Sequence, residues 1–176
     1  LAQGHGGEDR GIDILINASR DVQSTKPLDS DDASFDALMS QNVAATMRLS
    51  QAAAKRMITQ AERSEEDGEA GSIVNVTSIA SQRTVPELMS FSIASAALDQ
   101  LTRSMAVALA GNRIRVNAIA LGSVMSTSLR DALRERDGLA EELTAATPLG
   151  RIGEAAEAAE AAVFLASDSA SFITGR

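Results

Sequence analysis

GSIVNVTSIASQRTVPELMSFSIASAALD, residues 71–99, is the stretch that decides the fold of this chain. It begins with a short run rich in β-branched residues, 72–77, which predicts a buried strand of a parallel sheet. A polar turn follows, and residues 86–110 then predict a long helix, because proline is tolerated in a first turn and apolar side chains recur at helical spacing. The order strand, turn and long helix predicts part of a β-α-β unit.

The same alternation extends to both sides of this stretch. The sequence predicts further strands at 12–16 and 113–121 and further helices at 31–61, 128–143 and 154–166. Strands that alternate with helices of this length form parallel sheets through right-handed crossovers. We therefore expect an α/β fold with the whole chain, residues 1–176, as a single domain. The run at 62–70 is charged and lacks an apolar period, which predicts a mobile, solvated loop.

The composition argues against several classes of function. The 176 residues carry a net charge of −8 and include no Trp and no Tyr, so a basic face and stacking side chains for nucleic acid are both missing. No apolar run approaches the roughly 20 residues of a membrane span. The chain has no Cys and a single histidine, His5, which argues against a thiolate nucleophile and a metal cluster. We expect a cytoplasmic protein that binds no metal, nucleic acid or membrane.

Five segments follow one another in an order that is typical of one enzyme family. They are DILINAS at 13–19, QNVAATMRLSQAA at 41–53, SIVNVTSIAS at 72–81, RIRVNAIALGSVMST at 113–127 and PLGRIGEAAEAAEAAVFLASDSASFITG at 148–175. Together they resemble the classical short-chain dehydrogenase/reductase family, including its 3-oxoacyl carrier-protein reductases and 3-hydroxyacyl-CoA dehydrogenases. The resemblance implies a Rossmann-like, doubly wound parallel sheet flanked by helices. The family's N-terminal cofactor-binding strands and its last strand find no match in the sequence, so we expect the fold without them.

The resemblance also implies hydride transfer between a nicotinamide cofactor and a carbonyl or alcohol. In the family a tyrosine exchanges the hydroxyl proton, a lysine four residues later lowers the pKa of that tyrosine, and a serine holds the substrate oxygen. An asparagine on the preceding long helix helps a water chain to reach the lysine. Asn42 and Ser78 match the asparagine and the serine, but Phe91 stands at the tyrosine position and Ser95 at the lysine position. The general acid and its cation are both replaced.

The cofactor positions that the resemblance implies are altered as well. Asn17, Ala18 and Gly122 match positions that line the cofactor in the family, and Arg20 replaces a glycine beside the cofactor ribose. A bulky side chain there is expected to obstruct the ribose. The Gly-rich loop that holds the cofactor pyrophosphate at a helix N-terminus has no counterpart in the sequence. We therefore expect no cofactor in this chain, and NAD or NADP in an active partner.

The two long helices, 31–61 and 86–110, are the predicted partner surface. Both keep apolar stripes and small residues, and in the family the corresponding helices pair across a subunit interface. Our leading hypothesis is a pseudoenzyme, a catalytically inactive subunit that joins an active paralogue in an NAD(P)-dependent alcohol or hydroxyacyl-CoA-type dehydrogenase, as a heterotetramer.

Other hypotheses stay open beside this one. The chain could form a homo-oligomer, or it could be a divergent but active 3-oxoacyl reductase-like oxidoreductase in which Ser78 and a bound water replace the tyrosine. A further alternative is a ligand-binding module that uses the vestigial pocket. Titration with NADH and NADPH separates these hypotheses, because the inactive subunit binds neither, the enzyme binds and turns over, and the binding module binds nucleotide or acyl-CoA without turnover.

Overall fold

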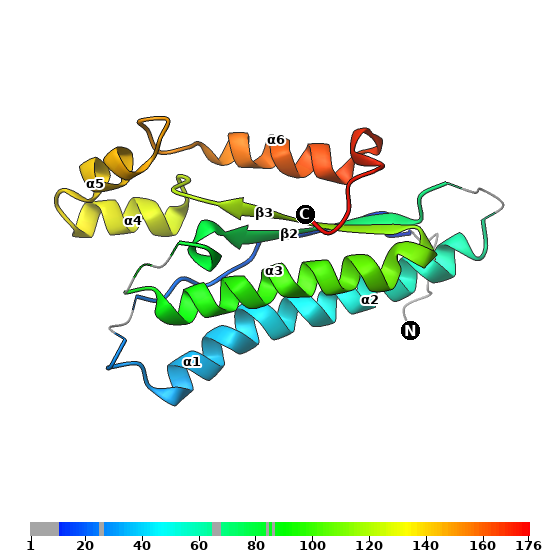
Figure 1. Ribbon diagram of the computed structural model, residues 1–176, viewed down its shortest axis with the longest axis horizontal. Helices are drawn as coiled ribbons and strands as arrows, with labels where there is room; N and C mark the ends of the chain where they lie inside the picture. Colours follow the sequence, from blue (N-terminus) through cyan, green and yellow to red (C-terminus); the bar gives the residue numbers. More distant parts are fainter. Residues whose placement is uncertain (1–10, 25–26, 65–67, 84, 86) are drawn as a thin grey trace, which may run out of the picture.

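The computed structural model describes residues 11–24, 27–64, 68–83, 85 and 87–176. A three-stranded parallel sheet lies at its centre, in the order β1 (Ile14–Asn17), β2 (Gly71–Ser78) and β3 (Ile114–Leu121). Helices lie against both faces of this sheet (Figure 1). The expected α/β fold, with a parallel sheet flanked by helices, is confirmed.

β2 is the central strand, and β1 is an edge strand with one open face. All residues of β2 except Val76 are buried, as expected of a parallel strand with helices on both sides. In β1, Ile14 and Ile16 are paired in register with Ser72 and Val74, yet they remain 52% and 43% exposed. The apolar run of β1 is therefore not covered on both faces, because the helix on that face contacts β2 and β3.

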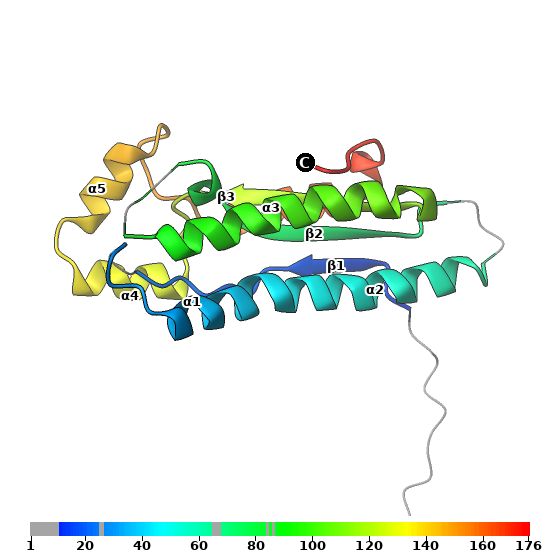
Figure 2. The ribbon, with the colours of Figure 1, turned by 60° about the horizontal axis from the view of Figure 1, so that its bottom comes forward.

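One face of the sheet carries α3 (Met89–Leu109), which in Figure 2 runs beside α1 (Asp32–Met39) and α2 (Ala45–Ala61), and these two follow one another end to end. The expected single helix over 31–61 is interrupted by a π-helical turn, η1 (Ser40–Ala44), between α1 and α2. The Asp31 carboxylate begins α1 by accepting the Ser34 backbone N–H at 2.8 Å.

The helix expected at 86–110 begins at Met89 instead. The segment before it turns, and the Leu88 N–H donates to the carbonyl of Val85 at 2.9 Å. The expected first-turn proline, Pro86, lies outside the described residues.

The main core lies between these helices and the sheet. Its buried members come from α2, β2, α3 and β3, and they are Ala53, Ala54, Met57, Ile73, Ala106, Ile114 and Val116. Gly71 begins β2 directly beneath Met57, and a Cβ at this position would lie 2.5 Å from the Met57 sulfur. Any larger residue at position 71 would therefore force the buried Met57 side chain to move.

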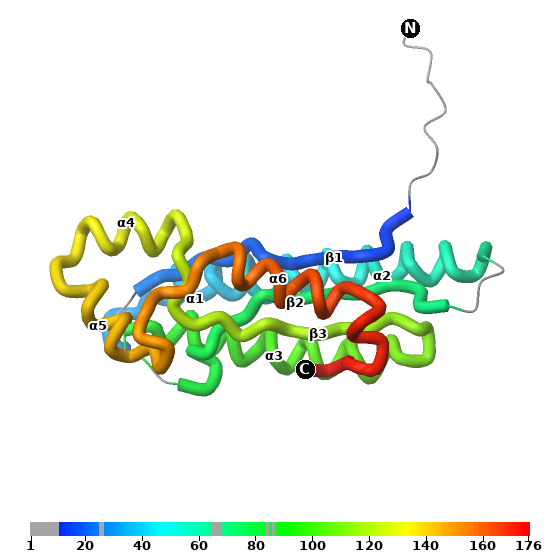
Figure 3. Tube along the Cα trace, turned by 90° about the horizontal axis from the view of Figure 1, so that it is seen from above, coloured from blue at the N-terminus to red at the C-terminus, as the bar shows by residue number. Residues whose placement is uncertain are grey.

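The opposite face of the sheet carries α6 (Ala155–Ala166), which lies over β2 and β3 (Figure 3). Val74 packs there against Ala162 and Ala166, whose small side chains allow a close helix. Two glutamates stabilise the start of α6. Glu154 and Glu157 form a reciprocal capping box, and Glu157 also forms an ion pair with Arg151 at 2.5 Å.

The charged segment between β3 and α6 forms two short helices rather than one. α4 (Thr127–Glu135) ends before a turn at Gly138, whose φ of 79° lies in the left-handed region, and α5 (Leu139–Ala146) follows. The turn between α3 and β3 includes a residue in the left-handed region. A 3₁₀ turn, η3 (Ala110–Asn112), follows α3, and the residue with positive φ is Arg113, at 59°.

Arg115 joins three parts of the chain beneath the end of α6. Its guanidinium forms a bidentate ion pair with Glu69, at 2.5 and 3.0 Å, and donates to the carbonyls of Leu165, Ser167 and Ile173. Residues 65–67 of the predicted mobile loop at 62–70 lie outside the described residues. Near the end of that loop, Glu69 is held by a buried arginine, which fixes the entry into β2.

Candidate functional site

Ser78 is the last residue of β2 and lies where the family's substrate-holding serine is predicted. Its side chain is buried, accepts the Ala80 N–H at 3.2 Å and donates to the Leu121 carbonyl over a long 3.4 Å. It thereby caps the 3₁₀ turn η2 (Ile79–Ser81). Ligands of parallel α/β sheets bind at the carboxyl ends of the strands, which is where Ser78 lies.

Asn42 lies within the π-helical turn η1, and the described partners of its amide are backbone groups. The Oδ1 atom accepts the Asp21 N–H at 2.7 Å, and Nδ2 donates to the Asp21 carbonyl at 2.8 Å. The Asn42 carbonyl accepts the Thr46 hydroxyl at 2.9 Å. Asn42 therefore ties the long helix to the segment that follows β1, and π turns of this kind recur at functional sites.

Phe91 and Ser95 occupy adjacent turns of α3 and are both buried, at 5% and 3% exposure. The Ser95 hydroxyl donates to the Phe91 carbonyl at 2.8 Å, within its own helix. Phe91 supplies a ring without an ionisable proton, and Ser95 supplies neither a charge nor a long side chain. The predicted tyrosine and lysine positions thus hold no acid and no cation.

Arg20 brings a cation to this place from a different element. Its guanidinium carbon lies 5.8 Å from the centroid of the Phe91 ring, and its Nη1 donates to the Thr77 carbonyl at 2.7 Å. Burial of the guanidinium lowers the pKa of Arg20. The sequence indicated only that this side chain is bulky. The structure shows that it joins the end of β1 to the end of β2 and to α3.

Asn17, predicted to line the cofactor, belongs to a buried polar network. Its Nδ2 donates to Ser50 Oγ at 3.0 Å and to Asn75 Oδ1 at 2.8 Å, while Asn75 Nδ2 donates to Thr102 Oγ1 at 2.9 Å. The network joins β1, β2, α2 and α3. Sequence analysis missed Ser50, Asn75 and Thr102, although Asn75 interrupts the apolar pattern of a buried strand and so gives a signal.

The other two predicted cofactor positions are exposed. Ala18 follows β1, and Gly122 follows β3 at the same edge of the sheet. A Cβ atom at Gly122 would lie 3.4 Å from Ile79 Cδ1. The structure therefore places Asn17, Ala18 and Gly122 at the carboxyl ends of two strands, and their role toward a cofactor stays a prediction.

These groups can donate hydrogen bonds and hold charge, but they are not arranged for proton transfer. Ser78 has no useful acidity near neutral pH without a base, and its described partners are a backbone N–H and a carbonyl. His5, the one histidine, lies outside the described residues. Within the described ranges, no group of three or more acidic, His or Cys side chains could hold a metal ion.

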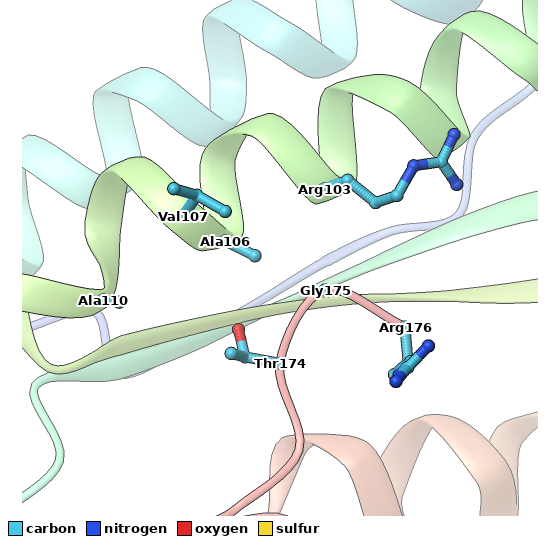
Figure 4. A pocket seen from close by; sticks show the side chains of 7 residues that line it. All are labelled: Arg103, Ala106, Val107, Ala110, Thr174, Gly175 and Arg176. Carbon is cyan, nitrogen blue, oxygen red and sulfur yellow. The ribbon is translucent and has the colours of Figure 1, made fainter.

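A cleft in the described part of the chain lies away from these residues. It has a volume of about 500 Å³, and it is lined by Arg103, Ala106, Val107, Ala110, Thr174, Gly175 and Arg176. Figure 4 shows the side chains of Arg103 and Arg176 pointing in different directions. None of the predicted site residues lines it. Among the described helices, none is both long enough and apolar enough to cross a membrane.

Comparison with known proteins matches nearly the whole chain to one family. The family model described as enoyl-(acyl carrier protein) reductase matches residues 4–176. Galactitol 2-dehydrogenase (L-tagatose-forming) of Cereibacter sphaeroides is 37% identical over 166 residues, covering 93% of this chain and 62% of its own length.

Two relatives come from one organism, Xanthobacter autotrophicus. 2-(S)-hydroxypropyl-CoM dehydrogenase 3 is 37% identical, covering 84% of this chain and 56% of its own length. The relative named inactive 2-(S)-hydroxypropyl-CoM dehydrogenase 2 is 36% identical, covering 78% of this chain and 58% of its own length. The chain therefore spans about three fifths of the length of the curated relatives it matches.

Solved structures agree with the sequence comparison. A gluconate 5-dehydrogenase from Burkholderia cenocepacia, in complex with NADP and tartrate, has a TM-score of 0.84 at 30% identity, covering 94% of this chain and 61% of that one. A short-chain dehydrogenase/reductase family protein has a TM-score of 0.79 at 34% identity, covering 93% and 63%.

Proposed function

The chain belongs to the short-chain dehydrogenase/reductase family, and from that premise we propose that it is a catalytically inactive member that assembles with an active paralogue. The assembly is an NAD(P)-dependent dehydrogenase for an alcohol or a hydroxyacyl-CoA-type substrate. This chain contributes structure, and its partner contributes the chemistry.

The observation that carries this proposal is the composition of the site around Phe91. General acid catalysis needs a group that can give up a proton in the reaction, and a phenol needs a nearby cation to lower its pKa. Phe91 has no proton to give, and the Ser95 hydroxyl is bonded to the Phe91 carbonyl. The cation of this region is Arg20, which already lies against the ring.

The position of Arg20 also supports the view that NAD or NADP is held by the partner. The solved gluconate 5-dehydrogenase holds NADP, and this chain shares its fold. In this chain an arginine replaces the family glycine beside the ribose, and its side chain extends from the end of β1 to Thr77 and Phe91. A cofactor at that position would have to displace a half-buried guanidinium.

The exposed sides of α2 and α3 support the partner surface. Leu49 on α2 is 57% exposed, and Ile93 and Val107 on α3 are 44% and 82% exposed. Exposed apolar side chains on neighbouring helices indicate a surface that another protein covers. The family also contains an inactive member beside a homologous dehydrogenase in one organism, as the names of the two Xanthobacter relatives state.

Co-expression with active family members tests the assembly. We expect the tagged chain to co-purify with one of them, and native mass measurement to give a complex containing both chains. A stable homo-oligomer that binds no active relative would contradict the proposed assembly.

A nucleotide titration tests the proposed inactivity separately. The chain alone is titrated with NADH and with NADPH, and the nucleotide fluorescence is followed. We expect no saturable change and no oxidation of nucleotide in the presence of carbonyl substrates. Turnover by the isolated chain would instead establish the divergent reductase.

A further inference from the structure

Arg20 carries a charge that no carboxylate balances in the described part of the chain. Its described contacts are the Thr77 carbonyl and the Phe91 ring, and both are neutral. The neighbouring carboxylate, Asp21, accepts instead from Gln23 Nε2 at 2.7 Å. A half-buried guanidinium with neutral partners is unusual, because taking a charge out of water is costly unless an opposite charge compensates it.

The guanidinium also keeps donors to spare. Arginine has five N–H donors in a planar fork, and one nitrogen of Arg20, Nη1, donates to the Thr77 carbonyl. The guanidinium carbon lies over the Phe91 ring, 5.8 Å from its centroid, and no other described residue accepts a hydrogen bond from the remaining donors. The buried Thr77 hydroxyl also has no described partner. A planar fork with free edge donors matches the oxygens of a carboxylate or a phosphate group.

The position of Arg20 is also one where ligands bind. It follows β1, and it contacts the penultimate residue of β2, so it lies at the carboxyl edge of a parallel sheet. Small ligands of open α/β sheets bind outside this edge. The cleft lined by Arg103 and Arg176 is less suited to an anion. The Arg103 side chain donates to Gln100 on its own helix, and the Arg176 side chain points in a different direction (Figure 4).

We propose that Arg20 is the anchor of a small oxyanion site, which takes a carboxylate or a phosphate group at the carboxyl edge of the sheet. The guanidinium donates two hydrogen bonds to the ligand, and the Phe91 ring keeps the guanidinium in position. This site goes beyond the proposed structural subunit and does not depend on the partner. It makes the vestigial pocket selective for an anion rather than for a dinucleotide.

Titration of the full chain with sodium acetate and with sodium phosphate tests this site. Ionic strength is held constant with sodium chloride, and the Nε–Hε signals of the arginines are followed by NMR together with the unfolding temperature. We expect a saturable shift of the Arg20 signal and a rise in unfolding temperature with at least one of the two anions. The anion whose titration saturates at the lower concentration identifies the ligand as a carboxylate or a phosphate.

Two variants assign the binding to Arg20. Arg20→Gln is expected to lower the affinity for the anion at least about tenfold, because a charge-assisted bidentate pair is lost. Arg103→Gln, which changes an exposed arginine on α3, is expected to bind as the unmodified chain does. The absence of a saturable Arg20 shift with either anion would overturn the proposal, as would equal binding by Arg20→Gln. If Arg20→Gln does not fold, the Arg20 signal of the unmodified chain decides alone.

Discussion

Arg20 and Phe91 bring a cation and a buried aromatic ring together at the carboxyl edge of the sheet. Phe91 keeps the volume of an aromatic ring in a buried position, and the Arg20 guanidinium lies over that ring. Ser95, one helical turn later, turns its hydroxyl back to its own helix. The cation of this region therefore comes from the end of β1 and not from α3. A lysine restored at position 95 would meet a positive charge that is already present.

This charge repulsion predicts that substitutions at positions 20 and 95 have non-additive effects on the free energy of unfolding. Ser95→Lys is expected to destabilise the chain, because it buries an ammonium near the Arg20 guanidinium. Arg20→Gly is expected to relieve part of that cost, with a coupling of at least about 1 kcal/mol in a double-mutant cycle measured by urea unfolding.

Ser104→Lys, at an exposed position of the same helix, is the matched control. It should change the free energy of unfolding by less than about 0.5 kcal/mol. Additive effects of Ser95→Lys and Arg20→Gly would show that the two positions do not share one site.

Part of this site could be predicted from the sequence, whereas the contacts of Arg20 could not. The family resemblance, matched at Ser78, implied that Phe91 and Ser95 stand at the altered positions. It could not place the Arg20 guanidinium, because a long side chain can take many directions and its choice depends on the ring and carbonyl that the fold brings near. The network of Asn17 and Asn75 was missed for the same reason, since it depends on strand register.

At the scale of elements, the sequence predicted where helices begin better than where they are interrupted. The helices expected to begin at residues 31 and 154 begin one residue later, at Asp32 and Ala155, with Asp31 and Glu154 as their N-caps. The π turn at Ser40–Ala44 has no comparable local signal. The split at Gly138 between α4 and α5 was also missed, although glycine with positive φ often ends a helix.

The start of α6 has a stability that depends on pH. The ion pair with Arg151 and the hydrogen bond from the Glu154 N–H lower the pKa of Glu157 from 4.5 to about 2. Because the folded pKa is below the ordinary one, the ionised carboxylate stabilises the helix start above pH 4.5, and this contribution is lost as pH falls from about 4.5 to 2. We expect the amide signals of the first turn of α6 to shift over this range in NMR spectra.

Glu157→Gln should remove that pH dependence and leave the first turn frayed at neutral pH. Glu160→Gln, an exposed change on the same helix, should leave the titration of the first turn unchanged. Amide shifts that follow pH in the same way in the Glu157→Gln chain would contradict the assignment.

Arg115 is expected to stabilise the junction of β3, α6 and the C-terminal segment. Its side chain is 7% exposed and its partner Glu69 is 26% exposed. Arg115→Met keeps the apolar stem but leaves Glu69 and the last carbonyls of α6 without their donor, so we expect a loss of about 3 kcal/mol in the free energy of unfolding. Arg134→Met breaks an exposed ion pair with Asp131 and should cost less than about 0.5 kcal/mol. Equal costs in urea unfolding would contradict this view of Arg115.

At the scale of the whole molecule, the two faces of the sheet are covered unequally. α1, α2 and α3 lie along one face, whereas α6 lies over β2 and β3 on the other (Figures 1 and 3). The order of strands and helices in the sequence was enough to predict a parallel sheet, because a helix between two strands returns the chain to the same end of the sheet. It did not predict the open face of β1, because an apolar strand has the same sequence whether or not a helix covers it.

The partner surface on α2 and α3 leads to the last prediction. Leu49→Glu and Val107→Glu each place a carboxylate on an exposed apolar position of one of these helices, and neither position contributes to the core. In a complex with an active paralogue each carboxylate would be buried without a partner, so we expect the yield of co-purified partner to fall at least about tenfold. The free energy of unfolding of the chain alone should stay within about 0.5 kcal/mol, because both positions are exposed in it. Leu149→Glu, 81% exposed in the turn before α6, is the matched control and should leave the complex intact. A complex that survives both helix variants, or one that Leu149→Glu weakens equally, would show that the partner binds elsewhere.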